Sequence, residues 1–173
     1  MSHLGAIRCT VLLSIGLAVT TVHGAEQPTG PDHDEASHDE AGHSHLAAFV
    51  GAGEEDVGGH RESAEAFGII YEYRFASGWD VGVALERLEV HGHTSTVAVI
   101  PVGYHLSSGL RLFAGPGRMF AGDSGEDKWL FRAGVSYEIH IGEHWAVAPE
   151  VFNDFLESGG NAWIAGVAIG RRF

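Results

Sequence analysis

The chain has 173 residues, which is enough for one domain or for one domain with a tail. Its net charge of −13 at pH 7 excludes the basic face that a nucleic-acid-binding protein needs, so we expect no nucleic-acid partner. The single cysteine, Cys9, excludes a disulfide framework.

Residues 1–25 have the pattern of a secretory signal peptide. Arg8 precedes an apolar run from Val11 to Val19, and small residues suited to cleavage follow at Gly24 and Ala25. The apolar run is too short for a membrane-spanning helix, which takes about 20 residues. We therefore expect this segment to be removed and the protein to be exported.

Residues 26–45 form a histidine-rich and acidic segment without large apolar side chains until its end, so we expect a disordered tail. Neutral imidazole suits zinc, nickel and copper, and neighbouring carboxylates add charge and further ligands. Two interpretations remain open, a metal-binding tail and a solvated acidic spacer, and no cofactor is required. The candidate ligands are His33, His38, His43, His45, Asp34 and Asp39.

Residues 46–173 contain recurring extended segments with turn residues between them. Several reach about ten residues, the length of a tilted strand that crosses a bilayer. Short connections alternate with longer ones at 54–63, 89–94, 121–127 and 156–161, which is typical of an up-and-down barrel. The expected strands are 46–53, 65–75, 79–88, 95–106, 110–120, 128–141, 144–155 and 162–173.

The two faces of these strands differ in a way that separates a membrane protein from a soluble one. In the third segment Trp79 and Val81 alternate with Asp80 and Gly82. An eight-stranded barrel has room inside only for side chains, so the small and charged residues belong to the lumen and the apolar residues face lipid. The predicted lumen residues are Glu72, Arg74, Asp80, Glu86, Arg111, Arg132, Glu138, Glu150, Asp154 and Arg172.

The sequence therefore predicts an all-β fold, an eight-stranded antiparallel up-and-down transmembrane β-barrel. A soluble periplasmic barrel or sandwich is the alternative. Pro101, Pro116 and Pro149 fall within expected strands. Because proline cannot donate a ladder hydrogen bond, we expect a bulge at each.

The strand endings "YEYRF" and "GVAIGRRF" and the final Phe173 resemble the small eight-stranded outer-membrane barrels, the class of the transmembrane domain of outer membrane protein A and its single-domain relatives. The resemblance covers residues 46–173. It implies a barrel in the outer membrane of a Gram-negative-type bacterium, surrounded by lipid, with the tail in the periplasm. It also implies that the last strand, ending at Phe173, is recognised by the barrel-assembly machinery. Arg171 departs from the pattern, which usually has an apolar residue there.

For function, we expect a monomeric barrel with a structural or accessory envelope role, a lumen closed by ion pairs and no enzymatic activity. A passive small-solute channel is the second hypothesis. A lipid A-modifying enzyme is the third, because His105 and Ser107 in "HLS" resemble the H-x-S motif of outer-membrane lipid A deacylases. No carboxylate is expected beside His105 to orient it, which argues against that activity.

Overall fold

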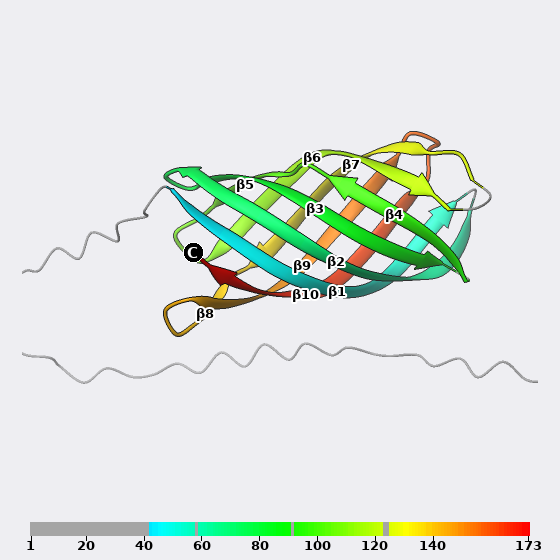
Figure 1. The fold of residues 1–173 in the computed structure, drawn as a ribbon. Coiled ribbons are helices and arrows are strands. Elements are labelled where there is room, and N and C mark those ends of the chain that lie inside the picture. The colour runs from blue at the N-terminus through cyan, green and yellow to red at the C-terminus, as the bar shows by residue number, and fades with distance from the viewer. Residues whose placement is uncertain (1–41, 58, 91, 123–124) are drawn as a thin grey trace, which may run out of the picture. The chain divides into compact units, whose positions relative to one another are not determined.

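The computed structural model describes residues 42–57, 59–90, 92–122 and 125–173, and its secondary structure is entirely β (Figure 1). No helix in these ranges is long and apolar enough to cross a membrane. The expected signal peptide and most of the expected tail lie outside the described residues. The strands are β1 (His43–Val57), β2 (His60–Ala76), β3 (Trp79–Val90), β4 (His93–Val99), β5 (Val102–His105), β6 (Leu110–Ala121), β7 (Lys128–Tyr137), β8 (Ile139–Ile141), β9 (Trp145–Leu156) and β10 (Asn161–Arg172).

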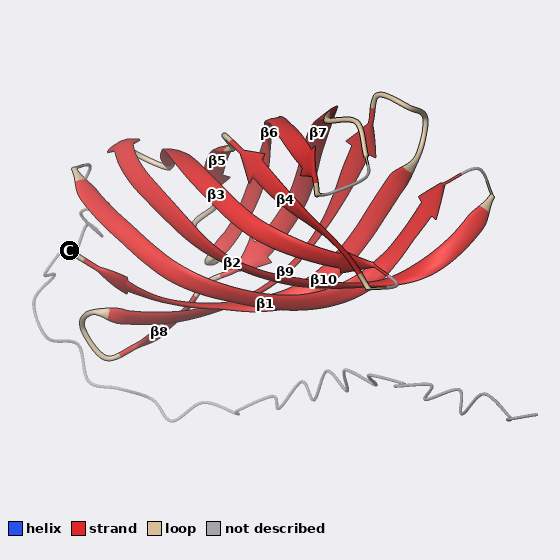
Figure 2. Cartoon of the chain, turned by 45° about the vertical axis from the view of Figure 1, so that its right-hand side comes forward, coloured by secondary structure: helices blue, strands red, loops and turns tan. Residues whose placement is uncertain are grey.

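The strands form one antiparallel ring of eight, in which β4 with β5 and β7 with β8 each act as a single interrupted strand. β10 pairs with β1 from His45↔Arg172 to Asp56↔Asn161, so the last strand closes the ring against the first. Figure 2 shows the strong tilt and curvature of the strands. The all-β transmembrane barrel fold predicted from the sequence is confirmed.

The prolines interrupt hydrogen bonding without inserting residues, so the expected bulges at these positions are wrong. Val99 pairs with Gly117 and Val102 with Ala114, which leaves the register unchanged across Pro101 and Pro116. Each of these two prolines still accepts a backbone hydrogen bond, from Gly82 at 2.9 Å and from Ile100 at 3.0 Å respectively. A proline lacks only its own N–H, and its carbonyl oxygen remains available to the ladder.

Pro149 behaves in the same way on β9. It lies between Glu150, which pairs with Ser136 of β7, and Val147, which pairs with Ile139 of β8. The gap between β7 and β8 therefore faces this proline. The two interruptions, between β4 and β5 and between β7 and β8, therefore both occur where a proline lacks the backbone N–H that would donate to the neighbouring strand.

The ring has two ends that we define by the chain. The terminal end carries residue 42, Phe173 and the connections 77–78, 106–109 and 142–144, and the opposite end carries the other four connections. Two of those four, expected to be long loops, are two-residue turns, because β1 and β2 extend to the pair Val57↔His60 and β3 and β4 to Val90↔His93. Gly59 and Gly92 have φ of 82° and 79°, as tight hairpins require.

β1 also begins earlier than expected, at His43 instead of Leu46. His43 pairs with Arg74 of β2, and Ser44 exchanges backbone hydrogen bonds with Phe173 at 2.9 and 3.3 Å. Residues 43–45 therefore belong to the barrel, and the tail boundary at residue 45 is corrected to precede residue 43. The reason is that β2 and the chain end supply backbone partners that the tail composition does not reveal.

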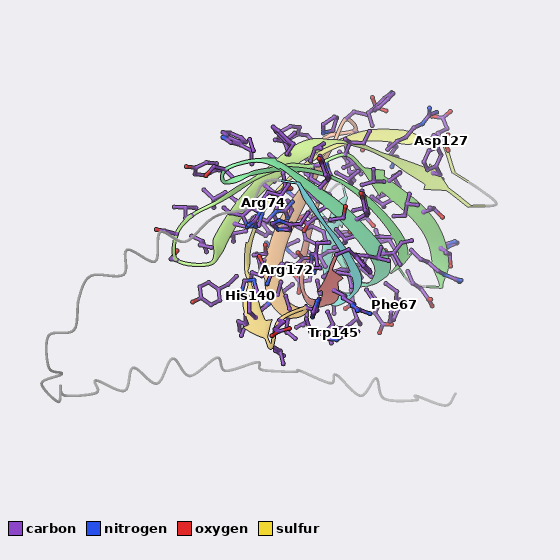
Figure 3. All side chains as sticks on the ribbon, turned by 60° about the vertical axis from the view of Figure 1, so that its left-hand side comes forward. Phe67, Arg74, Asp127, His140, Trp145 and Arg172 are labelled. Carbon is purple, nitrogen blue, oxygen red and sulfur yellow. The ribbon has the colours of Figure 1, made fainter. Side chains whose placement is uncertain are left out.

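Side chains alternate between the two faces as predicted. Along β3, Trp79 and Leu85 are exposed, whereas Asp80 and Glu86 are buried. Figure 3 shows side chains projecting from both faces of the ribbon, with Phe67 and Trp145 among the outer ones. The apolar belt therefore lies outside the ring, and the charged residues lie in the lumen.

Candidate functional site: the charged lumen

Arg132 of β7 holds two carboxylates near the middle of the lumen. Its Nε and Nη2 donate to Asp154 of β9 at 2.7 and 2.8 Å, in a bidentate pair. Its Nη2 also donates to Glu86 of β3 at 2.8 Å, and its Nη1 donates to the other oxygen of Glu86. All three residues are at most 3% exposed. The guanidinium therefore ties opposite walls of the barrel together.

A layer of phenylalanines lies against this ion-pair triad. The Arg132 guanidinium is 3.7 Å from the ring centroid of Phe152. Phe49 and Phe113 pack on Phe152 with centroid distances of 5.7 and 6.5 Å. Gly134 leaves the space for these rings, because a Cβ there would lie 2.6 Å from Phe113 Cζ and from Phe152 Cβ. Aromatic rings and charges together fill this section of the lumen.

A second ion-pair group lies towards the terminal end, around Arg111 of β6. Its Nε and Nη2 donate to Asp80 at 2.8 and 2.6 Å, and Nη2 also lies 2.9 Å from Glu72. His45 Nδ1 lies 3.2 Å from the other oxygen of Glu72. Arg74 and Glu138 form a weaker contact of 3.8 Å. All ten predicted lumen residues therefore lie on the inner face of the ring.

His105 links the two sides of this second group. Its Nε2 lies 2.8 Å from Asp80 Oδ2, and its Nδ1 lies 2.7 Å from Arg74 Nη2. A carboxylate only accepts and a guanidinium only donates, so the Nε2 proton points to Asp80 and the Nδ1 lone pair accepts from Arg74. The expectation that no carboxylate lies beside His105 is wrong, because Asp80 approaches it from β3, 25 residues away in the sequence.

The same geometry separates His105 from Ser107. Ser107 is exposed in the turn after β5, whereas the His105 ring points into the lumen with both nitrogens engaged. A general base must reach the hydroxyl that it activates. Neither ring nitrogen of His105 is left for that role in this arrangement.

The predicted metal ligands divide into two sets. His43 and His45 lie in β1 and line a small pocket at the terminal end. His33, His38, Asp34 and Asp39 lie outside the described residues. Within the ranges that the structure describes, no group of three or more His, Cys, Asp or Glu side chains could hold a metal ion.

Two pockets in the terminal half of the lumen each have a cavity volume of about 20 Å³, room for one or two water molecules. A wider pocket of about 530 Å³ opens at the terminal end, and Arg74, His105, Ser107 and Glu138 are among the residues that line it.

The sequence analysis missed His45 as a member of the lumen network, and it did not predict the contacts of His105 with Asp80 and Arg74. Alternation along β1 was the available signal for His45, because it shares the parity of the buried Ala47 and Phe49.

Comparison with known proteins places this geometry in a structural class. No protein-family model matches the chain, and no curated protein matches it either. Solved structures do match. The N-terminal β-barrel domain of Pseudomonas aeruginosa OprF superposes with a TM-score of 0.63 at 14% identity, covering 77% of this chain and 98% of that one.

The chain has the fold of the small eight-stranded outer-membrane β-barrels. The outer membrane protein OprG of P. aeruginosa matches with a TM-score of 0.52 at 13% identity, over 77% of this chain and 96% of that one. The attachment invasion locus protein Ail of Yersinia pestis, in complex with the heparin analogue sucrose octasulfate, matches with a TM-score of 0.54 at 13% identity, over 78% and 100%. The resemblance inferred from the sequence is confirmed at the level of fold.

Proposed function

We propose that this protein is a structural or accessory barrel of the outer membrane, with a lumen closed by ion pairs and aromatic rings. The observation that carries the proposal is the Arg132 bridge between Glu86 and Asp154, stacked on Phe152. A charge network that joins opposite walls stiffens the barrel and leaves no wide aqueous path at that level. Such a barrel acts in the envelope as a structural protein, and its two ends are exposed outside the membrane.

The outer surface supports placement in a membrane. Large apolar side chains along the strands are exposed, and Phe131, for example, is 50% exposed. Trp79 and Trp145 lie at the terminal end of the ring, and Trp129 and Trp163 lie at the opposite end, on either side of the apolar belt. Tryptophans in two girdles are typical of outer-membrane barrels. We assign the terminal end to the periplasm, as the resemblance to the small outer-membrane barrels implies.

The channel hypothesis predicts a continuous water-filled path, and the lumen geometry argues against it. The pockets beside Glu72 have room for only one or two waters, and the phenylalanine layer lies beyond them. The enzyme hypothesis is disfavoured by the engagement of His105 with Arg74 and Asp80. Binding of a heparin analogue is a property of the Ail complex, and the excess of acidic over basic side chains in this chain argues against transferring it.

Planar-bilayer recording tests the closed lumen. Purified protein should insert with little steady conductance, because paired charges and aromatic rings fill the interior. As a control, Phe152→Ala should raise the frequency of openings, since it removes the ring on which Phe49, Phe113 and Arg132 pack. Large stable openings in most wild-type insertions would refute the closed lumen and favour the channel.

A further inference from the structure

One buried carboxylate in the lumen differs from its neighbours in how its charge is balanced. Glu150 lies on β9, is 8% exposed and lines the lumen cavity. Among the described residues, no hydrogen bond or ion pair reaches its carboxylate, whereas Asp80, Glu86 and Asp154 each contact an arginine. Arg111 and Arg132 act on Glu150 only at longer range, and a buried charge without a close partner is unfavourable.

The nearby arginines are already engaged. Arg111 gives its Nε and Nη2 to Asp80 and approaches Glu72 at 2.9 Å. Arg132 gives Nε, Nη1 and Nη2 to Asp154 and Glu86. Of the ten charged lumen residues six are carboxylates, Glu72, Asp80, Glu86, Glu138, Glu150 and Asp154, and four are arginines, Arg74, Arg111, Arg132 and Arg172. Two negative charges therefore remain uncompensated by arginine.

A cavity of about 20 Å³ lies where the excess is concentrated. Glu72, Glu138 and Glu150 line it together with Ser136, which pairs with Glu150 across β7 and β9. This volume admits one or two waters or one small ion, and it excludes organic solutes. The charged and titratable groups that line the cavity or interact with Glu150 are His45 of β1, Glu72 of β2, Glu86 of β3, His105 of β5, Arg111 of β6, and Arg132 of β7 with the following Glu138.

We propose that Glu150 balances its buried charge by holding a proton on its carboxyl group beside this cavity. The bound proton balances the carboxylate that arginine leaves unpaired. The barrel is then most stable when Glu150 is protonated. The proposal does not depend on the closed lumen, because a conducting barrel with the same cavity would show the same dependence.

Glu150→Gln tests it, because the amide keeps the shape of the side chain and removes the charge. Unfolding in urea, followed by tryptophan fluorescence of protein in detergent micelles, is compared at pH 6 and pH 8. Each measurement is made in sodium chloride and in N-methylglucamine chloride at equal ionic strength. A midpoint that sodium raises over that in the bulky cation, with the difference lost in the Gln variant, would assign the charge to a bound cation and overturn the proposal.

The two salts should give the same midpoint for the wild type. Its midpoint should fall from pH 6 to pH 8 more than that of the Gln variant, because stability from a bound proton is lost as the pH rises. Glu150→Gln should be at least as stable as the wild type at pH 8. Identical pH dependence in the two proteins would overturn the proposal.

Glu86→Gln is the matched control, since it makes the same change at a paired carboxylate. It should lower the midpoint under all conditions, because it weakens the hold on Arg132. A similar loss in Glu150→Gln would assign Glu150 to an ordinary ion pair and contradict the proposal. The wild-type protein gives a second test that needs no variant. Its infrared spectrum should contain a protonated carboxyl band, and the absence of this band refutes the proposal.

Discussion

Replacing Arg132 by methionine should destabilise the barrel strongly. The substitution keeps an unbranched stem against Phe152 and removes the charge that Glu86 and Asp154 share. Removing one partner of a buried ion pair costs about 3–5 kcal/mol, and loss of a desolvated cation–π contact costs about 2 kcal/mol more. Because these losses are not additive, we expect a fall of about 4 kcal/mol in the free energy of unfolding.

The assay is urea unfolding of refolded protein in detergent micelles, monitored by tryptophan fluorescence and analysed for midpoint and slope. Arg118→Met is the matched control. Arg118 lies 3.0 Å from Asp127 and stacks on Phe120, but its side chain is 43% exposed. Exposed ion pairs are worth about 0–1 kcal/mol, so this variant should change stability by less than about 1 kcal/mol.

A combined variant separates lost charge pairing from lost packing. Adding Glu86→Gln and Asp154→Asn to Arg132→Met removes the two stranded carboxylates and should restore much of the stability. An Arg132→Met barrel within about 1 kcal/mol of the wild type would refute the reasoning. So would a combined variant that is no more stable than the single one.

Three further outcomes are expected. Gly134→Ala should lower the unfolding midpoint by the equivalent of about 1–3 kcal/mol, because its Cβ would lie 2.6 Å from Phe113 Cζ; an unchanged midpoint would contradict the tight packing. If the tail binds metal, removing residues 26–41, which leaves β1 intact, should abolish the calorimetric heats with zinc, nickel or copper. Metal binding by the intact protein should also weaken below about pH 6, because the imidazoles protonate. Equal heats from the two proteins would assign the tail to a spacer. Deleting Phe173 removes two backbone hydrogen bonds to Ser44 and should slow assembly in vesicles followed by gel mobility, and an unchanged rate would oppose a role for this residue.

The facing of the strands could be predicted from the sequence because alternation is a local property. Asp80 and Glu86 follow the same parity in the chain and in the barrel, whatever strands lie beside them. The contact of Asp80 with His105 could not be predicted, because it depends on how far β5 is shifted along the barrel relative to β3. The odd or even position of a residue along its strand assigns its side chain to the lumen. It does not determine how far along the barrel axis that side chain lies or which residue it contacts.

Strand ends were predicted less well than strand centres. At 54–63 the side chains are mostly acidic, glycine or polar, and the sequence therefore suggested a loop. Backbone pairing continues there to Val57↔His60 nonetheless. Beyond the apolar belt both faces of a hairpin meet water, so side-chain alternation disappears while the backbone hydrogen bonds persist. The same reasoning applies to residues 43–45 at the other end of β1.

The three prolines give the barrel wall an uneven compliance. Pro101, Pro116 and Pro149 all belong to the half of the ring that runs from β4 to β9, where each withholds a cross-strand donor. The half formed by β9, β10, β1, β2 and β3 is joined by long ladders without a proline gap, and its one register shift lies at the end of β2, between Arg74 and Ala76. Lateral pressure from the bilayer will therefore deform the proline-bearing half first. The pairing of β1 with β10, where the first and last strands meet, lies in the stiffer half.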